Sequence, residues 1–176
     1  MKAQNIDKGD KAPVFEAPAS LDGKEFNFTL KEAIAKGPVV LYFFPSAYTN
    51  GCDLQAATFS ESSEEFKKAG ATIVGISADD MDRLNSFSAD PDFCAGNFPV
   101  ASDPEGEIAK SFGLSFSPAR EGALDNRGEL INHGFIPRVT YVIDKKGTVQ
   151  AILSSENEGI SPDEHVKKSL EVVKSL

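Results

Sequence analysis

The sequence has few of the residues on which several classes of protein depend. Its 176 residues include two cysteines, two histidines and no tryptophan. Two cysteines are too few for the disulfide framework of a small secreted domain, and cysteines and histidines so scattered lack the spacing of zinc-ligand pairs. The start of the chain, residues 1–8, has no apolar stretch that could serve as a signal peptide. These absences predict a cytoplasmic protein without a metal site.

Long apolar runs and an excess of positive charge are also missing. The longest apolar run, residues 39–44, is too short to span a membrane. The formal net charge of -9 argues against nucleic acid or an anionic lipid surface as the main partner. A hydrophobic share of 40% and a charged share of 26% are typical of a globular protein in water. We expect a single domain over residues 1–176, since no internal repeat divides the chain.

Short segments rich in Val, Ile and aromatic residues, bounded by turn residues, predict four buried strands. They are residues 39–44, 72–78, 139–143 and 149–153. Residues 144–147 are typical of a tight turn between the last two strands. An Asp-Gly pair within residues 21–24 indicates a further hairpin near the N-terminus.

Apolar residues at helical spacing predict helices between and after these strands. They cover residues 54–69, 81–90, 105–112 and a last helix from residue 161 to near the end. Residues 115–137 have no clear period and predict a long loop, with at most a short extra element. The order of elements favours an α/β fold in which helices cover both faces of a mixed central β-sheet.

Cys52 stands where a buried strand would deliver a thiol to the first turn of a helix. The strand 39–44 ends at Pro45, the Thr49 hydroxyl comes three residues before the thiol, and Gly51 immediately precedes it. Free backbone N–H groups and the helix dipole favour a thiolate at such a position. The alternative is a small buried apolar residue with Thr49 as a helix cap.

A reactive thiolate also needs a cation, and Arg138 is the best candidate. It stands at the mouth of the strand 139–143, where an arginine is costly to desolvate unless an anion awaits it. Taken alone, Arg138 would read as a surface charge at a strand end. Arg83, Arg120 and Arg127 are alternatives, although their helical or loop contexts predict exposure. His133 in the long loop could line the active site, although a single loop histidine is more often solvated.

The segment Pro45-x-x-x-Thr49-x-x-Cys52 resembles the active-site signature of the peroxiredoxins, and Arg138 with Val-Thr-Tyr-Val-Ile-Asp resembles that family's arginine strand. The sequence of residues 49–56 is most similar to the Q-type, or bacterioferritin-comigratory-protein, subgroup of the alkyl hydroperoxide reductase/thiol-specific antioxidant family. The similarity extends to residues 9–15 and 103–106 and covers nearly the whole chain. It implies a thioredoxin-like fold with an N-terminal β-hairpin.

This resemblance implies a peroxidase that uses a cysteine in place of a metal, haem or flavin. Cys52 would be the peroxidatic cysteine, and its thiolate would become a sulfenic acid. Arg138 and Thr49 would hold the peroxide oxygens, and Pro45 would shield the sulfur from water. The implied partners are a hydroperoxide substrate and thioredoxin or a similar thiol reductant, and the implied assembly is a monomer or weak homodimer.

The second cysteine, Cys94, is implied to be the resolving one. Many Q-type members carry that residue five positions after the first, where this chain has Ala57. Others carry it in a segment like the one around Cys94, so the resemblance implies an intramolecular Cys52–Cys94 disulfide. A disulfide needs the two Cα atoms within about 7 Å, and the cysteines of this fold usually begin farther apart, so local unwinding around both is expected. The alternative is a one-cysteine enzyme that uses an external thiol. Resistance to overoxidation is also implied, since a Gly-Gly-Leu-Gly loop and a C-terminal Tyr-Phe helix are absent.

Two rival functions have less support. A thioredoxin-like carrier would need a Cys-x-x-Cys pair, and Cys52 is followed by Leu54 and Gln55 without a second thiol. A non-catalytic interaction or holdase domain with the same fold would not need Thr49 and Arg138 together with the thiol.

Overall fold

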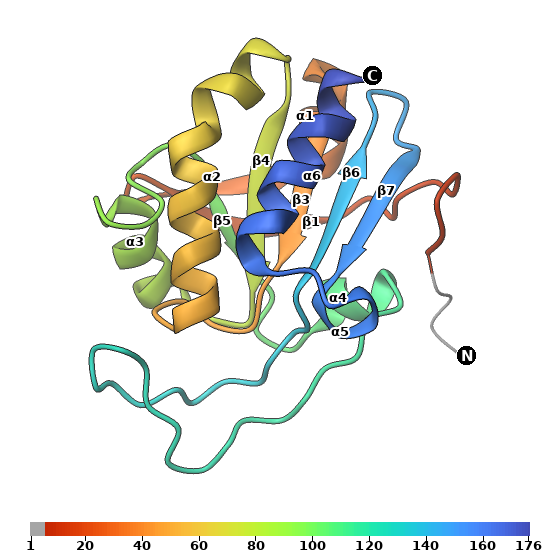
Figure 1. Cartoon of the computed structure of the whole chain (residues 1–176). Helices are drawn as coiled ribbons and strands as arrows, with labels where there is room; N and C mark the ends of the chain where they lie inside the picture. The colour runs from red at the N-terminus through yellow and green to blue at the C-terminus, as the bar shows by residue number, and fades with distance from the viewer. Residues whose placement is uncertain (1–5) are drawn as a thin grey trace.

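A computed structural model describes residues 6–176. Within this range one mixed sheet has the strand order β2-β1-β5-β4-β3-β6-β7 (Figure 1). The strands are β1 (Glu16–Leu21), β2 (Lys24–Thr29), β3 (Val39–Phe43), β4 (Thr72–Ser77), β5 (Val100–Ser102), β6 (Val139–Ile143) and β7 (Val149–Ser154). The pairs β3–β4 and β4–β5 are parallel, and the other pairs are antiparallel. The α/β, thioredoxin-like fold class and the N-terminal hairpin are confirmed.

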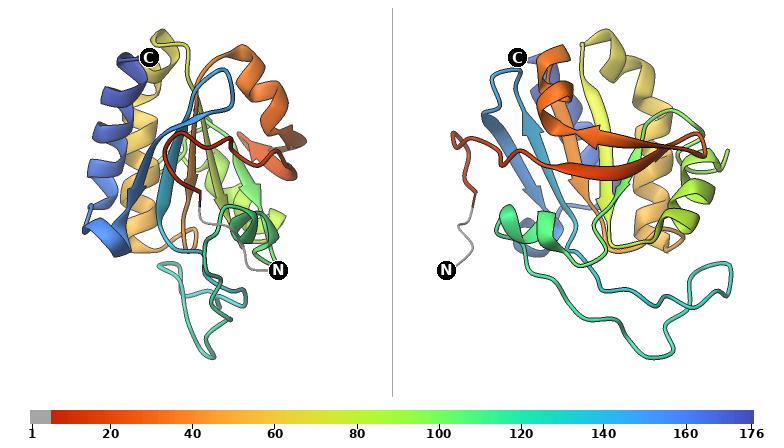
Figure 2. Two further views of the ribbon diagram at one scale, coloured as in Figure 1. Left: turned by 90° about the vertical axis from the view of Figure 1, so that its right-hand side faces the viewer. Right: turned by 180° about the vertical axis from the view of Figure 1, so that it is seen from behind.

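Helices cover both faces of this sheet. They are α1 (Leu30–Lys36), α2 (Asn50–Lys68), α3 (Met81–Ala89), α4 (Glu107–Ser111), α5 (Ser155–Glu158) and α6 (Pro162–Lys174). Helices α2 and α6 lie side by side on one face, and α1 lies on the other (Figure 2). No helix in residues 6–176 is long and apolar enough to cross a membrane.

The sheet separates two apolar cores, and β3 contributes to both. Val39, Leu41 and Phe43 point into the core beneath α1 and α4, whereas Val40 and Tyr42 point into the core beneath α2, α3 and α6. Alternate side chains of a strand face opposite sides, so a central strand covered on both faces is buried along its whole length. Each fully buried apolar side chain contributes about 1.5–3 kcal/mol, which makes β3 a rigid support for the turn and the helix α2 that come after it in the chain.

Several element bounds differ from the predicted ones. Strand β6 matches residues 139–143, but α2 begins at Asn50 rather than 54, and α4 is shorter than the predicted 105–112. Strand β5 and helices α1 and α5 were not predicted. They have three, seven and four residues, too few for a hydrophobic period to stand out.

The segment 115–137 is a long loop, as predicted. Isolated bridges pair Ser117 with Phe135 and Leu124 with Leu130, so the loop folds back on itself. It projects from the end of the molecule at which α2 begins (Figure 1). The backbone N–H of Asn126 donates to the carbonyl of Tyr48 at 2.8 Å, which places the loop against the chain that leads into α2.

Candidate active site

Cys52 lies in the first turn of α2, at the end of a buried strand, where the sequence predicts it. Strand β3 ends at Phe43, five residues follow Phe44, and α2 begins at Asn50. The side chain of Cys52 is 1% exposed. Backbone N–H groups in the first turn of a helix have no intrahelical acceptor, and the dipole adds partial positive charge there. The first turn of α2 can therefore hold an anion near this sulfur.

Arg138 points its guanidinium at this sulfur. Its Nη2 donates to Cys52 Sγ at 3.3 Å, and its Nη1 donates to Gln55 Oε1 at 2.6 Å. The sheet explains this meeting, because β3 and β6 are antiparallel neighbours with Phe43 opposite Val139. The residue before β6 is thus brought beside the chain that leaves β3.

Gly51 makes room for this arginine. A Cβ at position 51 would lie 2.8 Å from Nη2 of Arg138, closer than real Cβ contacts. Gln55 also holds the Arg138 side chain, and it lies one turn after Cys52 on the same helix. Its Oε1 fixes Arg138, while its Nε2 is buried without a hydrogen-bond partner among the described residues. The i, i+3 spacing from Cys52 was the available sequence signal for this role.

Thr49 and Pro45 flank the thiol along the chain. Thr49 is the N-cap residue of α2, but its hydroxyl donates to the carbonyl of Ser46 at 2.7 Å and accepts from no helix N–H. The oxygen of that hydroxyl keeps lone pairs that can accept a further hydrogen bond. Pro45 is half-buried at the turn after β3. Neither side chain has a hydrogen bond to Cys52 in the described part of the chain.

Cys94 lies in the turn that follows α3 and is fully buried. Burial raises the pKa of its thiol well above the usual value, and the negative charges of Asp90 and Asp53 add to the effect. Both cysteines are free, so no bond joins Cys52 to Cys94 in this structure, although both lie in the core beneath α2, α3 and α6. The structure thus brings Arg138 to Cys52 and keeps Cys94 as a separate, protonated thiol.

A buried charged cluster holds the segment between β3 and α2. Asp79 Oδ2 accepts from the N–H of Ala47 at 2.8 Å, and Arg83 Nη2 donates to the carbonyl of Ala47 at 3.0 Å. Arg83 also bonds Asp79 at 2.7 Å and Asp125 at 2.9 Å. His133 Nε2 lies 2.9 Å from Asp79 Oδ1. These contacts fix the backbone of residues 46–47 from two sides.

Two expectations about this cluster are wrong. Arg83 was expected to be exposed but is buried, because Asp79 and Asp125 compensate its charge. His133 was expected to be solvated but packs against Asp79. Burial lowers the pKa of His133, yet its hydrogen bond and ion pair with Asp79 outweigh burial and raise it. Burial raises the pKa of Asp79, and His133 and Ser77 more than offset this and lower it.

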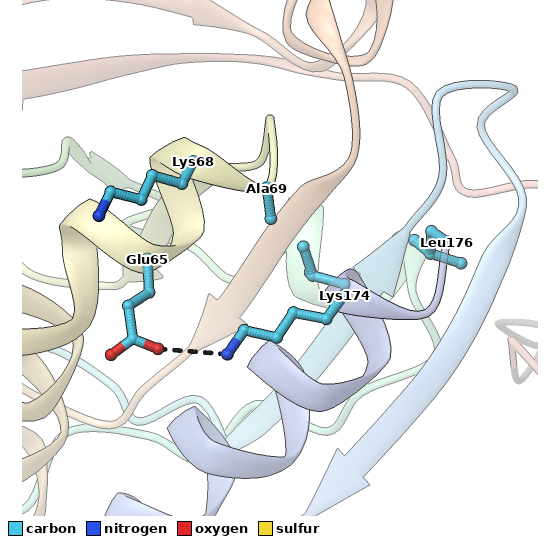
Figure 3. A pocket seen from close by; sticks show the side chains of 6 residues that line it. Glu65, Lys68, Ala69, Lys174 and Leu176 are labelled. Atoms are coloured by element: carbon cyan, nitrogen blue, oxygen red, sulfur yellow. Dashed lines mark hydrogen bonds and ion pairs between the residues drawn. The ribbon is translucent and has the colours of Figure 1, made fainter.

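A separate hollow lies far from this site. It is lined by Glu65, Lys68, Ala69, Val173, Lys174 and Leu176, where α2 and α6 end (Figure 3). Glu65 and Lys174 pair across it at 3.4 Å. With about 1.5 Å of rise per helical residue, Glu65 is roughly 20 Å along α2 from Cys52. This hollow therefore plays no part in the chemistry of the thiol.

Comparisons with known proteins agree with the geometry. The AhpC/TSA family profile matches residues 8–152. Chloroplastic peroxiredoxin Q of Populus jackii is 38% identical over 172 residues, which is 97% of this chain and 70% of the relative. The wheat (Triticum aestivum) protein of the same name is 34% identical over 160 residues. That match covers 85% of this chain and 64% of the wheat protein, so the chain spans about two thirds of these relatives.

Solved structures show the same similarity. Peroxidoxin BcpB of Mycobacterium tuberculosis superposes with a TM-score of 0.77 and 31% identity, covering 98% of this chain and 99% of BcpB. Peroxiredoxin Q of Xanthomonas campestris gives a TM-score of 0.68 and 26% identity, covering 90% and 89%.

The expected cytoplasmic location is contradicted by these relatives. The proteins from poplar, wheat and Gentiana triflora are all named as chloroplastic, and these names overturn the expectation. The expectation rested on composition and on the lack of an apolar stretch in residues 1–8, and neither property distinguishes the cytoplasm from an organelle.

Proposed function

The chain belongs to the AhpC/TSA family as a peroxiredoxin of the Q type, and from this premise we propose that Cys52 reduces hydroperoxides and that Cys94 resolves the product. Peroxiredoxins are thiol peroxidases whose substrate is a hydroperoxide and whose electrons come from a thiol reductant. The assignment of the steps to particular residues is our proposal. So are a single catalytic domain over residues 1–176, a monomeric or weakly dimeric state, and thioredoxin as the reductant.

In the first step the Cys52 thiolate attacks the terminal oxygen of the peroxide. A sulfur–oxygen bond forms while the O–O bond breaks, so Cys52 becomes a sulfenic acid and the departing oxygen leaves as water or an alcohol after taking up a proton. Arg138 and the Thr49 hydroxyl stabilise the charge that grows on the departing oxygen, as donors do in an oxyanion hole. Pro45 keeps water from the sulfur.

In the second step Cys94 attacks the sulfur of the sulfenic acid. A disulfide forms, the sulfur–oxygen bond breaks, and hydroxide leaves with the thiol proton as water. Both cysteines are buried in the reduced protein, so their segments must open before the sulfurs meet. Thioredoxin or a similar dithiol then reduces the disulfide. The alternative is a one-cysteine cycle in which an external thiol attacks the sulfenic acid.

One observation carries this proposal: Arg138 Nη2 lies 3.3 Å from Cys52 Sγ, in a space that only Gly51 leaves open. A buried small apolar cysteine needs no guanidinium at hydrogen-bond distance, and an interaction or holdase domain does not need one either. Arg138 is half-buried, and desolvating part of an arginine beside a thiol is costly unless an anion is held there.

The test is intact mass with disulfide mapping after one equivalent of hydrogen peroxide is added to the fully reduced protein. We expect loss of two hydrogens and a Cys52–Cys94 linkage. Cys52→Ser should abolish peroxide turnover, and Arg138→Ala should slow Cys52 oxidation by about 10²–10³-fold without unfolding the protein. Cys94→Ser should stop at the sulfenic acid and lose recycling by thioredoxin. Gain of one oxygen without a disulfide in the natural protein would favour the one-cysteine alternative, and no reaction would refute the peroxidase.

A further inference from the structure

Tyr48 has a backbone conformation that tyrosine rarely adopts. Its φ is 61°, in the left-handed region that favours glycine. The residue is buried and lies immediately before Thr49, the N-cap residue of the helix that carries Cys52. A non-glycine residue keeps such a conformation only where its surroundings hold it there, and such strain collects at functional sites.

The side chain of Tyr48 reaches across to the segment that carries Cys94. Its ring packs edge-on against Phe87 at 5.1 Å and against Phe93 at 5.6 Å between centroids. Its hydroxyl donates to Asp90 Oδ2 at 3.3 Å. Burial and the negative charge of Asp90 raise the pKa of Tyr48 to about 12, so the phenol stays protonated as the donor. Tyr48 therefore ties the chain before Cys52 to the chain before Cys94.

Asp90 organises the turn that contains Cys94. Its Oδ1 accepts from the N–H of Asp92 at 3.0 Å, and its carbonyl accepts from the N–H groups of Phe93 at 3.1 Å and Ala95 at 2.9 Å. Ala95 has a φ of 52°, so this segment also holds a strained residue beside its cysteine. Opening both segments would relieve both strains, and Tyr48 is bonded to the residue that closes the second.

A third segment also meets Tyr48. The Tyr48 carbonyl accepts from the N–H of Asn126 at 2.8 Å, and the Arg127 guanidinium lies 3.7 Å from the centre of its ring. Asn126 reaches further to Asp53 Oδ2 at 2.8 Å, one residue past Cys52. The loop 115–137 thus contacts both the backbone and the ring of Tyr48 and helps to hold its conformation.

We propose that Tyr48 is a positioning residue that latches the Cys52 and Cys94 segments closed and so sets the rate of disulfide formation. This rests on the proposed function, since it requires Cys94 to resolve the Cys52 sulfenic acid. While the latch holds, the sulfenic acid stays beside Arg138, where a second peroxide can oxidise it to sulfinic acid. When the latch opens, the sulfur atoms can meet. Weakening Tyr48 should therefore favour disulfide over sulfinic acid.

The experiment compares Tyr48→Phe with the natural protein and with Tyr141→Phe. Tyr141 is a matched control, because its buried hydroxyl donates one hydrogen bond, to the carbonyl of Phe112 at 3.4 Å, in the core on the other side of the sheet from the cysteines. Reduced protein is mixed with excess hydrogen peroxide, quenched at intervals with a thiol alkylator, and read by intact mass. Tyr48→Phe should raise the ratio of disulfide to sulfinic acid by roughly 3- to 10-fold, the effect of losing one hydrogen bond of ordinary strength, since this bond is long at 3.3 Å. Tyr141→Phe should leave the ratio unchanged.

A second measurement separates the latch from a merely structural role. Hydrogen exchange of the Phe93 and Ala95 amides should accelerate in Tyr48→Phe and not in Tyr141→Phe. Asp90→Asn should act as Tyr48→Phe does, and the double variant should add little, because both changes remove the same bond. Equal ratios in Tyr48→Phe and the natural protein, or fully additive effects, would overturn the latch alone. Absence of any Cys52–Cys94 disulfide in the natural protein would overturn the proposed resolution step as well.

Discussion

Gly51→Ala should separate the stability of this protein from its reactivity. Gly51 is helical, and alanine is favoured over glycine inside a helix by about 0.5–1 kcal/mol. The added Cβ would lie 2.8 Å from Arg138 Nη2 and 3.4 Å from Pro162 Cγ. The first contact must lengthen, and the end of a long side chain is the cheapest part to move. The guanidinium should therefore leave the sulfur while the fold is kept.

The size of the effect depends on the 3.3 Å separation of Arg138 Nη2 and Cys52 Sγ. With an effective dielectric constant of about 20, unit charges at that distance attract by roughly 5 kcal/mol, and moving them about 1 Å apart loses roughly 1 kcal/mol. Loss of the hydrogen bond to a charged sulfur adds about 1.5–3 kcal/mol. Together these losses are about 2.5–4 kcal/mol, so we expect the rate constant for Cys52 oxidation to fall by about 60- to 700-fold, since each 1.4 kcal/mol is tenfold.

The assay is the second-order rate constant for hydrogen peroxide, measured by rapid quench, beside denaturant unfolding of the same preparations. Asn50→Ala is the control, because Asn50 is an exposed residue in the same helical turn. A Gly51→Ala rate within twofold of the natural protein would refute the reasoning, since the arginine would then tolerate the methyl group. A loss of several kcal/mol of stability in the variant would refute it equally, since the strain would then lie in the backbone.

Three further predictions concern stability. The pKa of His165 is lowered to about 4 by burial and by Arg138, so as pH falls the unfolded chain takes up this proton before the folded one does. About 3 kcal/mol of stability should therefore be lost between pH 6.5 and pH 4. His165→Gln should remove this loss when the free energy of unfolding is measured over that pH range. The pKa of His133 is raised, so its contribution is present below pH 6.5 and lost as pH rises through the folded value; His133→Gln should remove this loss when unfolding is compared at pH 6 and 9. Phe59 is fully buried with its ring 4.6 Å from that of Tyr42, so Phe59→Ala should cost about 3–5 kcal/mol in urea unfolding, and a cost below 1 kcal/mol would contradict the packing.

Much of the central sheet and the position of Cys52 could be predicted because their signals are local. The apolar run of β3 and the residues of β6 carry the strand pattern within five residues each. Proline, a hydroxyl, glycine and cysteine then follow one another along the chain, as in the first turn of a helix. The position of Arg138 at the start of β6 needed one further assumption, that β3 and β6 are neighbours.

The remainder of the site is non-local and gave no such signal. Asp125 and His133 come from the loop 115–137, far along the chain from Asp79 and Arg83, and only the folded structure shows that these groups compensate one another's charges. Their burial results from this pairing and cannot be read from an acidic or basic residue alone. A left-handed tyrosine is likewise invisible in sequence, because nothing about Tyr48 marks its φ.

The pairing of β3 with β6 affects how reactive the Cys52 thiol is before folding is complete. Cys52 and its arginine are 86 positions apart in the chain. Synthesis proceeds at about 5–20 residues per second, so Arg138 is translated several seconds after Cys52. The thiol leaves the ribosome before Arg138 has been added to the chain. We expect the nascent thiol to be an ordinary, slow nucleophile throughout that interval. Reactivity toward peroxide then arises only in a finished chain, which protects half-made molecules from oxidation that they could not yet reverse.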